Sequence, residues 1–277
     1  MPVQAIRLIR KLRGGAQSHL MECDDGRFYV VKFRNNPQHR RILVNEWISA
    51  AFLRYLQISV PDTAIVNVSA EFLEKTPDAY LQLGSKHLAI EPGWHFGSAF
   101  PGDPARIAVY DFIPDLLLEK VVNLNEFLGV LVFDKWAANA DSRQSVFYRA
   151  RLKQWVAGAD EFLTRTGFVA NMMDHGYAFN GPHWTFTDSP LQGLYFRPSV
   201  YQHVRSFDDF QPWLDRVTHF PEEVVDDALK QLPPTWIEGD EDVVKQLMTK
   251  LMSRRKRVPD LIRDSTSGRI NPFPNWT

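Results

Sequence analysis

Apolar and polar residues alternate at the start of the chain with a period of two, which is the period of a half-buried strand. The alternation predicts three antiparallel strands at residues 5–12, 18–23 and 28–33. Asn36 is a suitable N-cap and Pro37 suits the first helical position, so an amphipathic helix is predicted from there to about residue 57. The N-terminal part should therefore combine a small sheet with one helix.

Further along, the pattern predicts a strand at 86–91 and then changes character. Glycine and proline are dense in residues 92–104, which indicates a loop, and we place a boundary near Glu91. Two helices are predicted at 115–122 and 123–138, the second with Asn123 or Asn125 as its cap. The chain after the boundary should be largely helical.

A second group of elements surrounds a polar loop. The predicted order is the loop 138–144, a strand 145–150, a return 151–158, a strand 168–174, and helices that include 221–232 and 240–255.

Composition narrows the function classes. Of the 277 residues, 44% are apolar and 13% aromatic, enough for an ordinary globular core. The 32 basic and 33 acidic residues give a net charge of −1, so no global field recruits nucleic acid or an anionic membrane. Cys23 is the single cysteine and excludes an internal disulfide, and no stretch has the length of a membrane anchor or the apolar core of a signal peptide. We expect a cytoplasmic protein.

Two charged residues occupy positions that the pattern predicts to be buried. Lys32 ends the third strand on the same face as Val30, and Glu46 lies on the apolar stripe of the predicted helix. Taken alone, Lys32 is more often a solvent-exposed edge lysine and Glu46 a residue at the margin of the stripe. A buried carboxylate needs a cation, however, and in protein kinases a strand lysine held by a helix glutamate grips the nucleotide phosphates.

A glycine-bearing loop precedes the second strand and contains Gly14, Gly15, Gln17 and Ser18. Glycines let backbone N–H groups approach phosphate oxygens, as a nucleotide-binding loop requires. The loop matches neither GxGxxG nor a Walker A motif, and a hairpin turn explains its two glycines equally well.

Two aspartates in the second half provide the acidic groups that phosphoryl transfer needs. Asp141 lies in the polar loop after a long apolar helix, and Asp174 ends a later strand directly before His175-Gly176. One carboxylate could orient an acceptor hydroxyl while the other binds Mg²⁺. Each alone could simply cap a loop or start a turn, but their joint order favours the chemical role.

With these residues in view, the chain resembles the HipA-like kinases, whose fold is related to that of protein and phosphatidylinositol kinases. The resemblance runs from about residue 14 to residue 179 and rests on GGAQS, YVVKF, VNEWISAAFLRYL, HLAIEPG, FDKWAANADSRQ and MMDHGYAF. It implies a two-lobed α+β fold, with an antiparallel-sheet N-lobe at 1–91, a mainly helical C-lobe at 92–277, and ATP between them.

The resemblance also implies roles for individual residues. Lys32 would bind the phosphates with Glu46 as its partner, Asp141 would be the catalytic aspartate, and Asp174 would bind Mg²⁺. The hinge strand that meets adenine would be Ala89, Ile90 and Glu91.

One position departs from the family pattern. An asparagine that serves as a second Mg²⁺ ligand usually follows the catalytic aspartate by about five residues, and Val146 stands there. Gln144 or Ser145 could supply an oxygen after a small shift of the loop, and Asn139 lies just upstream. The segment 95–104 has no assigned counterpart; it is either a surface loop or an element that bridges the lobes or faces the acceptor.

The predicted function is therefore ATP- and Mg²⁺-dependent transfer of a γ-phosphoryl group to an unidentified hydroxyl acceptor, a protein Ser or Thr among the candidates. Two alternatives stay open. One is a pseudokinase-type regulatory module that binds nucleotide without transfer, which the missing asparagine motivates. The other is a small-molecule or lipid kinase.

Overall fold

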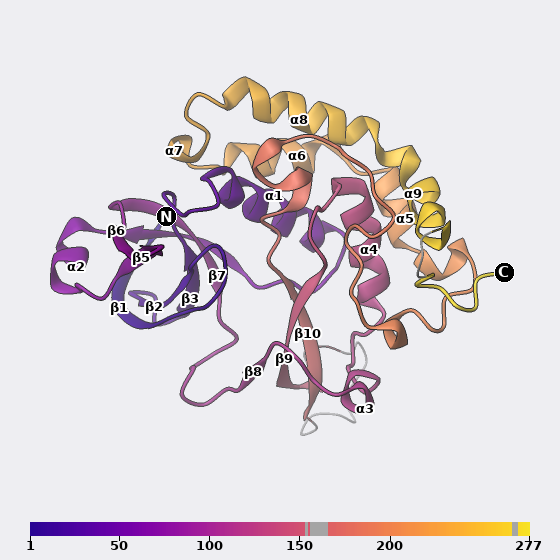
Figure 1. Cartoon of the computed structure of the whole chain (residues 1–277), viewed down its shortest axis with the longest axis horizontal. Helices are drawn as coiled ribbons and strands as arrows, with labels where there is room; N and C mark the ends of the chain where they lie inside the picture. Colours follow the sequence, from indigo (N-terminus) through magenta and orange to yellow (C-terminus); the bar gives the residue numbers. More distant parts are fainter. Residues whose placement is uncertain (153–154, 156–165, 268–270) are drawn as a thin grey trace.

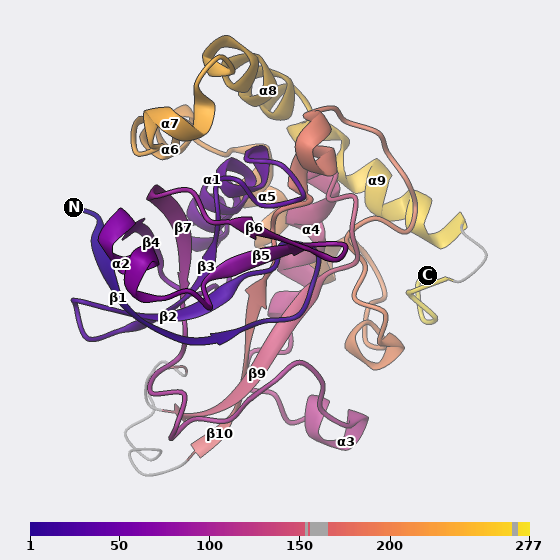
Figure 2. The same ribbon diagram turned by 60° about the vertical axis from the view of Figure 1, so that its left-hand side comes forward.

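A computed structural model describes residues 1–152, 155, 166–267 and 271–277. Most of the predicted return at 151–158 lies outside the described residues. Figure 1 shows a strand-rich part built from the N-terminal residues beside a helix-rich part, with β9 (Gln144–Arg151) and β10 (Thr166–Met173) reaching away from the helices as a long ribbon. Figure 2 shows the same arrangement from another side.

Five strands close into a barrel. Their order is β1 (Val3–Lys11), β2 (His19–Cys23), β3 (Phe28–Lys32), β7 (Gly93–Ala99) and β4 (Thr63–Val68), with β4 parallel to β1 and every other neighbouring pair antiparallel. The first three predicted strands are confirmed to within two residues at either end. The inward-facing Met21, Val31 and Val66 belong to a small apolar core of the barrel. Closure pairs the strand edges with one another.

The predicted loop at 92–104 is wrong, because β7 occupies its first half and pairs with both β3 and β4. His95, Phe96 and Gly97 are buried in succession, so this strand lacks the alternation that marks a half-buried strand. Gly97 is required by packing, since a Cβ there would lie 2.5 Å from the Val66 side chain. Because β7 pairs with β3 and β4, the barrel extends beyond the boundary expected near Glu91 and ends at Ala99, the last residue of β7.

The strand predicted at 86–91 forms outside the barrel. β6 (Lys86–Ala89) pairs with β5 (Tyr80–Leu83) as a separate hairpin that follows the short helix α2 (Ala70–Lys75). In Figure 2 this hairpin crosses in front of the barrel strands.

Helix α1 (Arg41–Tyr55) begins later than predicted. Asn36 instead fixes a turn, in which its Oδ1 accepts from the Gln38 N–H at 2.9 Å and its Nδ2 donates to the Phe33 carbonyl at 2.7 Å. Such local bonds compete with helix formation. α1 is not amphipathic as predicted, because it is buried on almost every side; in the main core its Phe52 stacks on Trp136 with ring centroids 5.7 Å apart.

The second sheet has the order β10-β9-β8, with β8 at Val109–Tyr110. The predicted helix at 115–122 is limited to α3 (Asp115–Leu118), and the next helix, α4, spans Glu126–Ala137. Asn123 caps neither helix, because its side-chain amide bonds both backbone groups of Ala170 in β10, at 2.8 and 2.9 Å.

The remaining helices surround α1 and α4. They are α5 (Trp213–Thr218), α6 (Glu222–Lys230), α7 (Pro234–Ile237), α8 (Glu241–Ser253) and α9 (Val258–Asp264), and they confirm the helices predicted near 221–232 and 240–255. Among the described residues, no helix has the length and apolar character needed to cross a membrane.

Gly129, in the middle of α4, gives a test of this packing. Alanine would favour the helix by about 1 kcal/mol, but its Cβ would lie 2.4 Å from the ring of Trp213, which is 6% exposed. Overpacking of this kind costs about 1–3 kcal/mol. We therefore expect Gly129→Ala to lower the urea midpoint of unfolding, whereas Lys245→Ala, on the exposed face of α8, should leave it unchanged. An equal or higher midpoint for Gly129→Ala would contradict this packing.

Candidate active site

A cavity of about 740 Å³ lies between the barrel, α1 and the strands β9 and β10. It brings together most of the site residues predicted from the sequence. They are Gly14, Gly15, Gln17 and Ser18 of the glycine-bearing loop, Lys32 of β3, Glu46 of α1, Asp141 and Gln144 of the polar loop and the start of β9, and Asp174.

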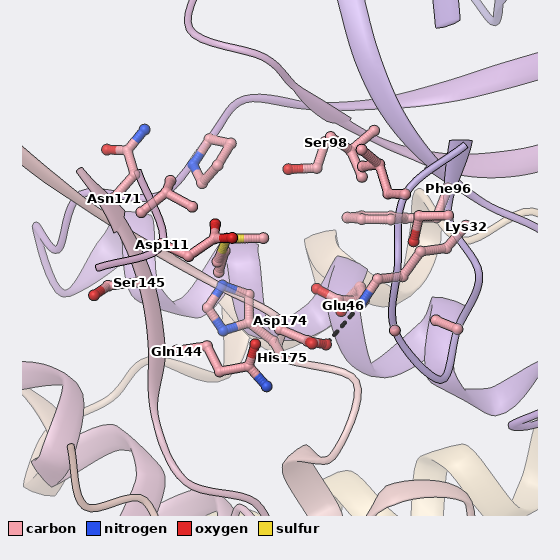
Figure 3. A pocket seen from close by; sticks show the side chains of 18 of the residues that line it. Lys32, Glu46, Phe96, Ser98, Asp111, Gln144, Ser145, Asn171, Asp174 and His175 are labelled. Atoms are coloured by element: carbon pink, nitrogen blue, oxygen red, sulfur yellow. Dashed lines mark hydrogen bonds and ion pairs between the residues drawn. The ribbon is translucent and has the colours of Figure 1, made fainter. Parts of the chain in front are cut away.

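Lys32 joins the two halves of this site. Its ammonium group donates to Glu46 Oε1 and, at 2.7 Å, to Asp174 Oδ1 (Figure 3). The Lys32 and Glu46 side chains are 9% and 4% exposed. Burial by itself would lower the pKa of Lys32, but the charges of Glu46 and Asp174 outweigh it and raise that pKa, so the ammonium stays charged.

The two carboxylates beside Lys32 differ in character. The charge of Lys32 lowers the pKa of Asp174 against the effect of burial, and the side chain is 34% exposed. Burial raises the pKa of Glu46, which Lys32 opposes. Asp174 is therefore an ionised group that lines the cavity, whereas Glu46 is buried beside Lys32 and the backbone of His175. Asp174 also has a left-handed backbone, with φ at 57°, a strain of about 1–2 kcal/mol for a residue with a Cβ.

The loop that bears Asp141 is fixed by its neighbours. Ala138 ends α4 with a left-handed φ of 47°. The buried Asn139 donates to Asp134 Oδ1 at 3.0 Å and accepts from the Asp141 N–H at 3.2 Å. Asp141 is exposed; its carboxylate accepts from the Ser142 N–H at 2.8 Å, and Gln144 Nε2 lies 3.4 Å from it.

Arg143 is a residue that the sequence reasoning missed. It is buried, its Nε donates to Asp134 Oδ2 at 2.8 Å, and a second N–H donates to the Met173 carbonyl at 2.9 Å. The same group lies 3.0 Å from His175 Nδ1. Burial, then the charge of Arg143, lowers the pKa of His175, so the ring is neutral and accepts. Arg143 thus links α4 to both the Asp141 and the Asp174 segments. One signal for such a residue was present in the sequence: Asp134 ends the apolar run FLGVLVFD, and a carboxylate buried with that run needs a cation nearby.

Ala89, Ile90 and Glu91 do not line the cavity. Ala89 is exposed on the outer hairpin, Ile90 packs in the barrel core, and Glu91 pairs with Arg34 at 2.8 Å. The cavity wall that the sequence reasoning assigned to them is formed by β7 and the residues after it, among them Phe96, Ser98, Ala99, Phe100 and Pro101.

Gln17 lines the cavity, but its side chain is used elsewhere. Its amide bonds both the N–H and the carbonyl of Gln82 in β5. It therefore ties the glycine-bearing loop to the outer hairpin.

The mixed helix and strand architecture and this cavity define a kinase-like protein, and comparison with known proteins agrees. The HipA-like kinase family matches residues 5–263, so the chain belongs to that family. A crystal structure of the Golgi casein kinase with Mn/ADP bound is similar in fold, with a TM-score of 0.50 and 13% identity over 97% of this chain and 73% of that one. A second structure of the Golgi casein kinase has a TM-score of 0.48 and 10% identity over 97% and 72% of the two chains. No curated protein sequence matches the chain.

The pair between Arg143 and Asp134 gives a test of how the Asp141 loop is held. Arg143→Met leaves the Asp134 carboxylate buried without its cation, and we expect a loss of about 3–5 kcal/mol of unfolding free energy. Burial already raises the pKa of Asp134, and removing Arg143 raises it further.

The sign of the pH dependence follows from that pKa. A folded-state pKa above the unfolded value means that the variant keeps its stability at low pH and loses it as the pH rises through the folded pKa. Urea unfolding should therefore show a larger deficit at about pH 8 than at about pH 5, and Arg143→Met with Asp134→Leu should recover part of it. A deficit independent of pH would show that removing Arg143 does not raise the folded-state pKa of Asp134.

Proposed function

We propose that this chain is an ATP- and Mg²⁺-dependent phosphotransferase that moves the γ-phosphoryl group of ATP to a hydroxyl acceptor. The observation that carries the proposal is the ammonium of Lys32, held by Glu46 and Asp174 at the wall of a 740 Å³ cavity. A positive group and an ionised carboxylate side by side suit a nucleotide phosphate with its cation.

The proposed nucleotide lies between two lobes, the barrel up to Ala99 and the remainder of the chain. Val30, Phe96 and Ala99 give the cavity apolar surface for the base. The backbone N–H groups near Gly14 and Gly15 would meet the phosphates, together with Lys32.

The donor set fits Mg²⁺ bound jointly by protein and phosphate. No group of three or more His, Cys, Asp or Glu side chains that could hold a metal is found among the described residues. Mg²⁺ characteristically takes one or two carboxylates and completes its shell with phosphate oxygens and water. Asp174 would be the carboxylate, with Gln144 as a further oxygen. Ser145 Oγ also lines the cavity, buried and without a hydrogen-bond partner among the described residues. When bound, the cation neutralises phosphate charge.

Asp141 is the residue proposed to act on the acceptor. Its carboxylate is exposed at the cavity, while its backbone is held through Asn139. It would orient the acceptor hydroxyl or take its proton as the oxygen attacks the phosphorus in line. Both a protein hydroxyl and a small hydroxylated molecule satisfy this chemistry.

A second candidate function is a nucleotide-binding module without transfer. Val146 favours it, because this side chain lines the cavity and offers no oxygen where a second metal ligand would be needed. Titration of ATP with and without Mg²⁺, followed by transfer and self-phosphorylation assays, separates the two functions. Binding without transfer to proteins or small hydroxylated molecules would support the module.

Asp141→Asn tests the catalytic assignment. The amide cannot accept the acceptor proton, so transfer or self-phosphorylation should fall by about 10²–10⁴-fold while ATP affinity stays the same. Asp226→Asn, the same change on the exposed face of α6, should keep its activity. Wild-type transfer rates in Asp141→Asn would remove this residue from the mechanism.

Lys32→Met tests the phosphate contact. Loss of a charge-assisted bond should weaken ADP binding by roughly 10–100-fold in a calorimetric titration. Arg7→Met removes an exposed cation from β1 and should leave the affinity unchanged. Unaltered ADP affinity in Lys32→Met would place the nucleotide elsewhere.

A further inference from the structure

Residues 174–184, which follow β10, hold an unusual number of left-handed residues. Asp174, Phe179, Asn180 and Trp184 have φ of 57°, 59°, 59° and 53° and none is glycine. Such residues persist only where their surroundings determine the backbone from outside. The question is what supplies that constraint.

A single buried side chain, Asn45 of α1, makes four hydrogen bonds to this segment. Its Nδ2 lies 2.6 Å from the Gly176 carbonyl and 3.0 Å from those of Ala178 and Gly181. Its Oδ1 accepts from Trp184 Nε1 at 2.8 Å. Two N–H groups are shared among three carbonyls, and the carbonyls and the indole donor together dictate which way the amide points.

The same part of α1 makes further contacts with this segment. A Cβ on Gly176 would lie 2.5 Å from Ile42, so the segment is pressed against the helix. Arg41 donates to the Pro182 carbonyl at 2.9 Å and lies 4.4 Å from the Trp184 ring. Ile42, Asn45 and Glu46 share one helical face, so the residue that bonds this segment is adjacent to the partner of Lys32.

We propose that Asn45 is a positioning residue that holds residues 174–184 in their left-handed course and thereby presents Asp174 to the divalent cation. The inference rests on the proposed function of Asp174. Asn45 touches neither nucleotide nor acceptor; it acts through the backbone that begins at Asp174. Residues that orient a metal ligand from behind typically change metal affinity by about 10–100-fold when altered.

Asn45→Asp is the sharpest test, because it keeps the shape and the acceptor for Trp184 but turns an acceptor oxygen towards three carbonyls. We expect the increase in ADP affinity that Mg²⁺ produces to be about 10–100-fold smaller in this variant than in the wild type. The ADP affinity measured without Mg²⁺, in the presence of a chelator, should be unchanged. Hydrogen exchange of amides 176–184 should rise at least about tenfold. Trp184→Phe removes one bond of the set and should give a smaller change in the same direction.

A control separates positioning from general destabilisation. Phe273→Leu loosens the core near the C-terminus, where its ring packs on Tyr201, Phe210 and Trp276, and should leave the exchange of 176–184 and the Mg²⁺ enhancement unchanged. If Asn45→Asp does not fold, Trp184→Phe is judged alone against this control.

Two outcomes are distinguishable. If the hydrogen exchange of 176–184 and the Mg²⁺ enhancement in Asn45→Asp match those of Phe273→Leu, the inference is overturned while the proposed function stays intact. Absence of any ADP binding by the wild type would overturn the proposed function and the metal role together, and exchange would then report only whether Asn45 holds the segment.

Discussion

The structure depends on the burial of one positive charge. An ammonium group removed from water is unfavourable unless carboxylates replace the solvent, and Lys32 obtains its two from separate parts of the chain, Glu46 on α1 and Asp174 after β10. The barrel, the helix and the second sheet therefore meet at one point. The same requirement explains why Lys32, Glu46 and Asp174 come together at the cavity wall, since moving β3 away would leave two carboxylates without their shared cation.

Helix α1 fixes the position of Glu46 relative to Lys32 and Asp174, because the helix itself is held by the larger core. Its buried residues Leu43, Val44, Ile48, Phe52 and Leu53 belong to the main core and not to the small core of the barrel, and the helix contacts α6 and α7. At its start, Arg41 Nε donates to Asp240 Oδ2 at 3.0 Å, which ties it to the loop before α8. Although α1 lies between strands β3 and β4 in the sequence, it is packed as a member of the C-terminal helices. The position of Glu46 is accordingly set by the larger core.

Local patterns predicted those parts of the fold and site that depend on neighbouring residues. The strands β1 to β3 follow from short-range alternation and the Asp-x-Gly segment from its residue order. The pairing of Lys32 with Glu46 was expected from the need of a buried carboxylate for a cation and from the resemblance to kinases. β7 could not be found in this way, because a strand buried on both faces has no alternation and its Gly97 resembles a loop signal. Ala89, Ile90 and Glu91, which were expected beside the nucleotide base, do not line the cavity, whereas residues of the missed strand β7 do. Arg143 was missed for a different reason: its partner Asp134 is nine residues away on another element, and no period links them.

The buried charges around the cavity define geometry more than they add stability. A buried ion pair recovers little beyond its own desolvation, and apolar replacements of similar volume are often as stable. Yet the pairs of Lys32 and of Arg143 both end at the segment from Met173 to His175, one through a carboxylate and the other through a carbonyl and a ring nitrogen. An apolar core could pack this segment in several ways, whereas directional bonds from two sides admit one. The left-handed backbone of Asp174 is compatible with that single arrangement, so the strain at this residue and the two buried cations beside it are parts of the same constraint.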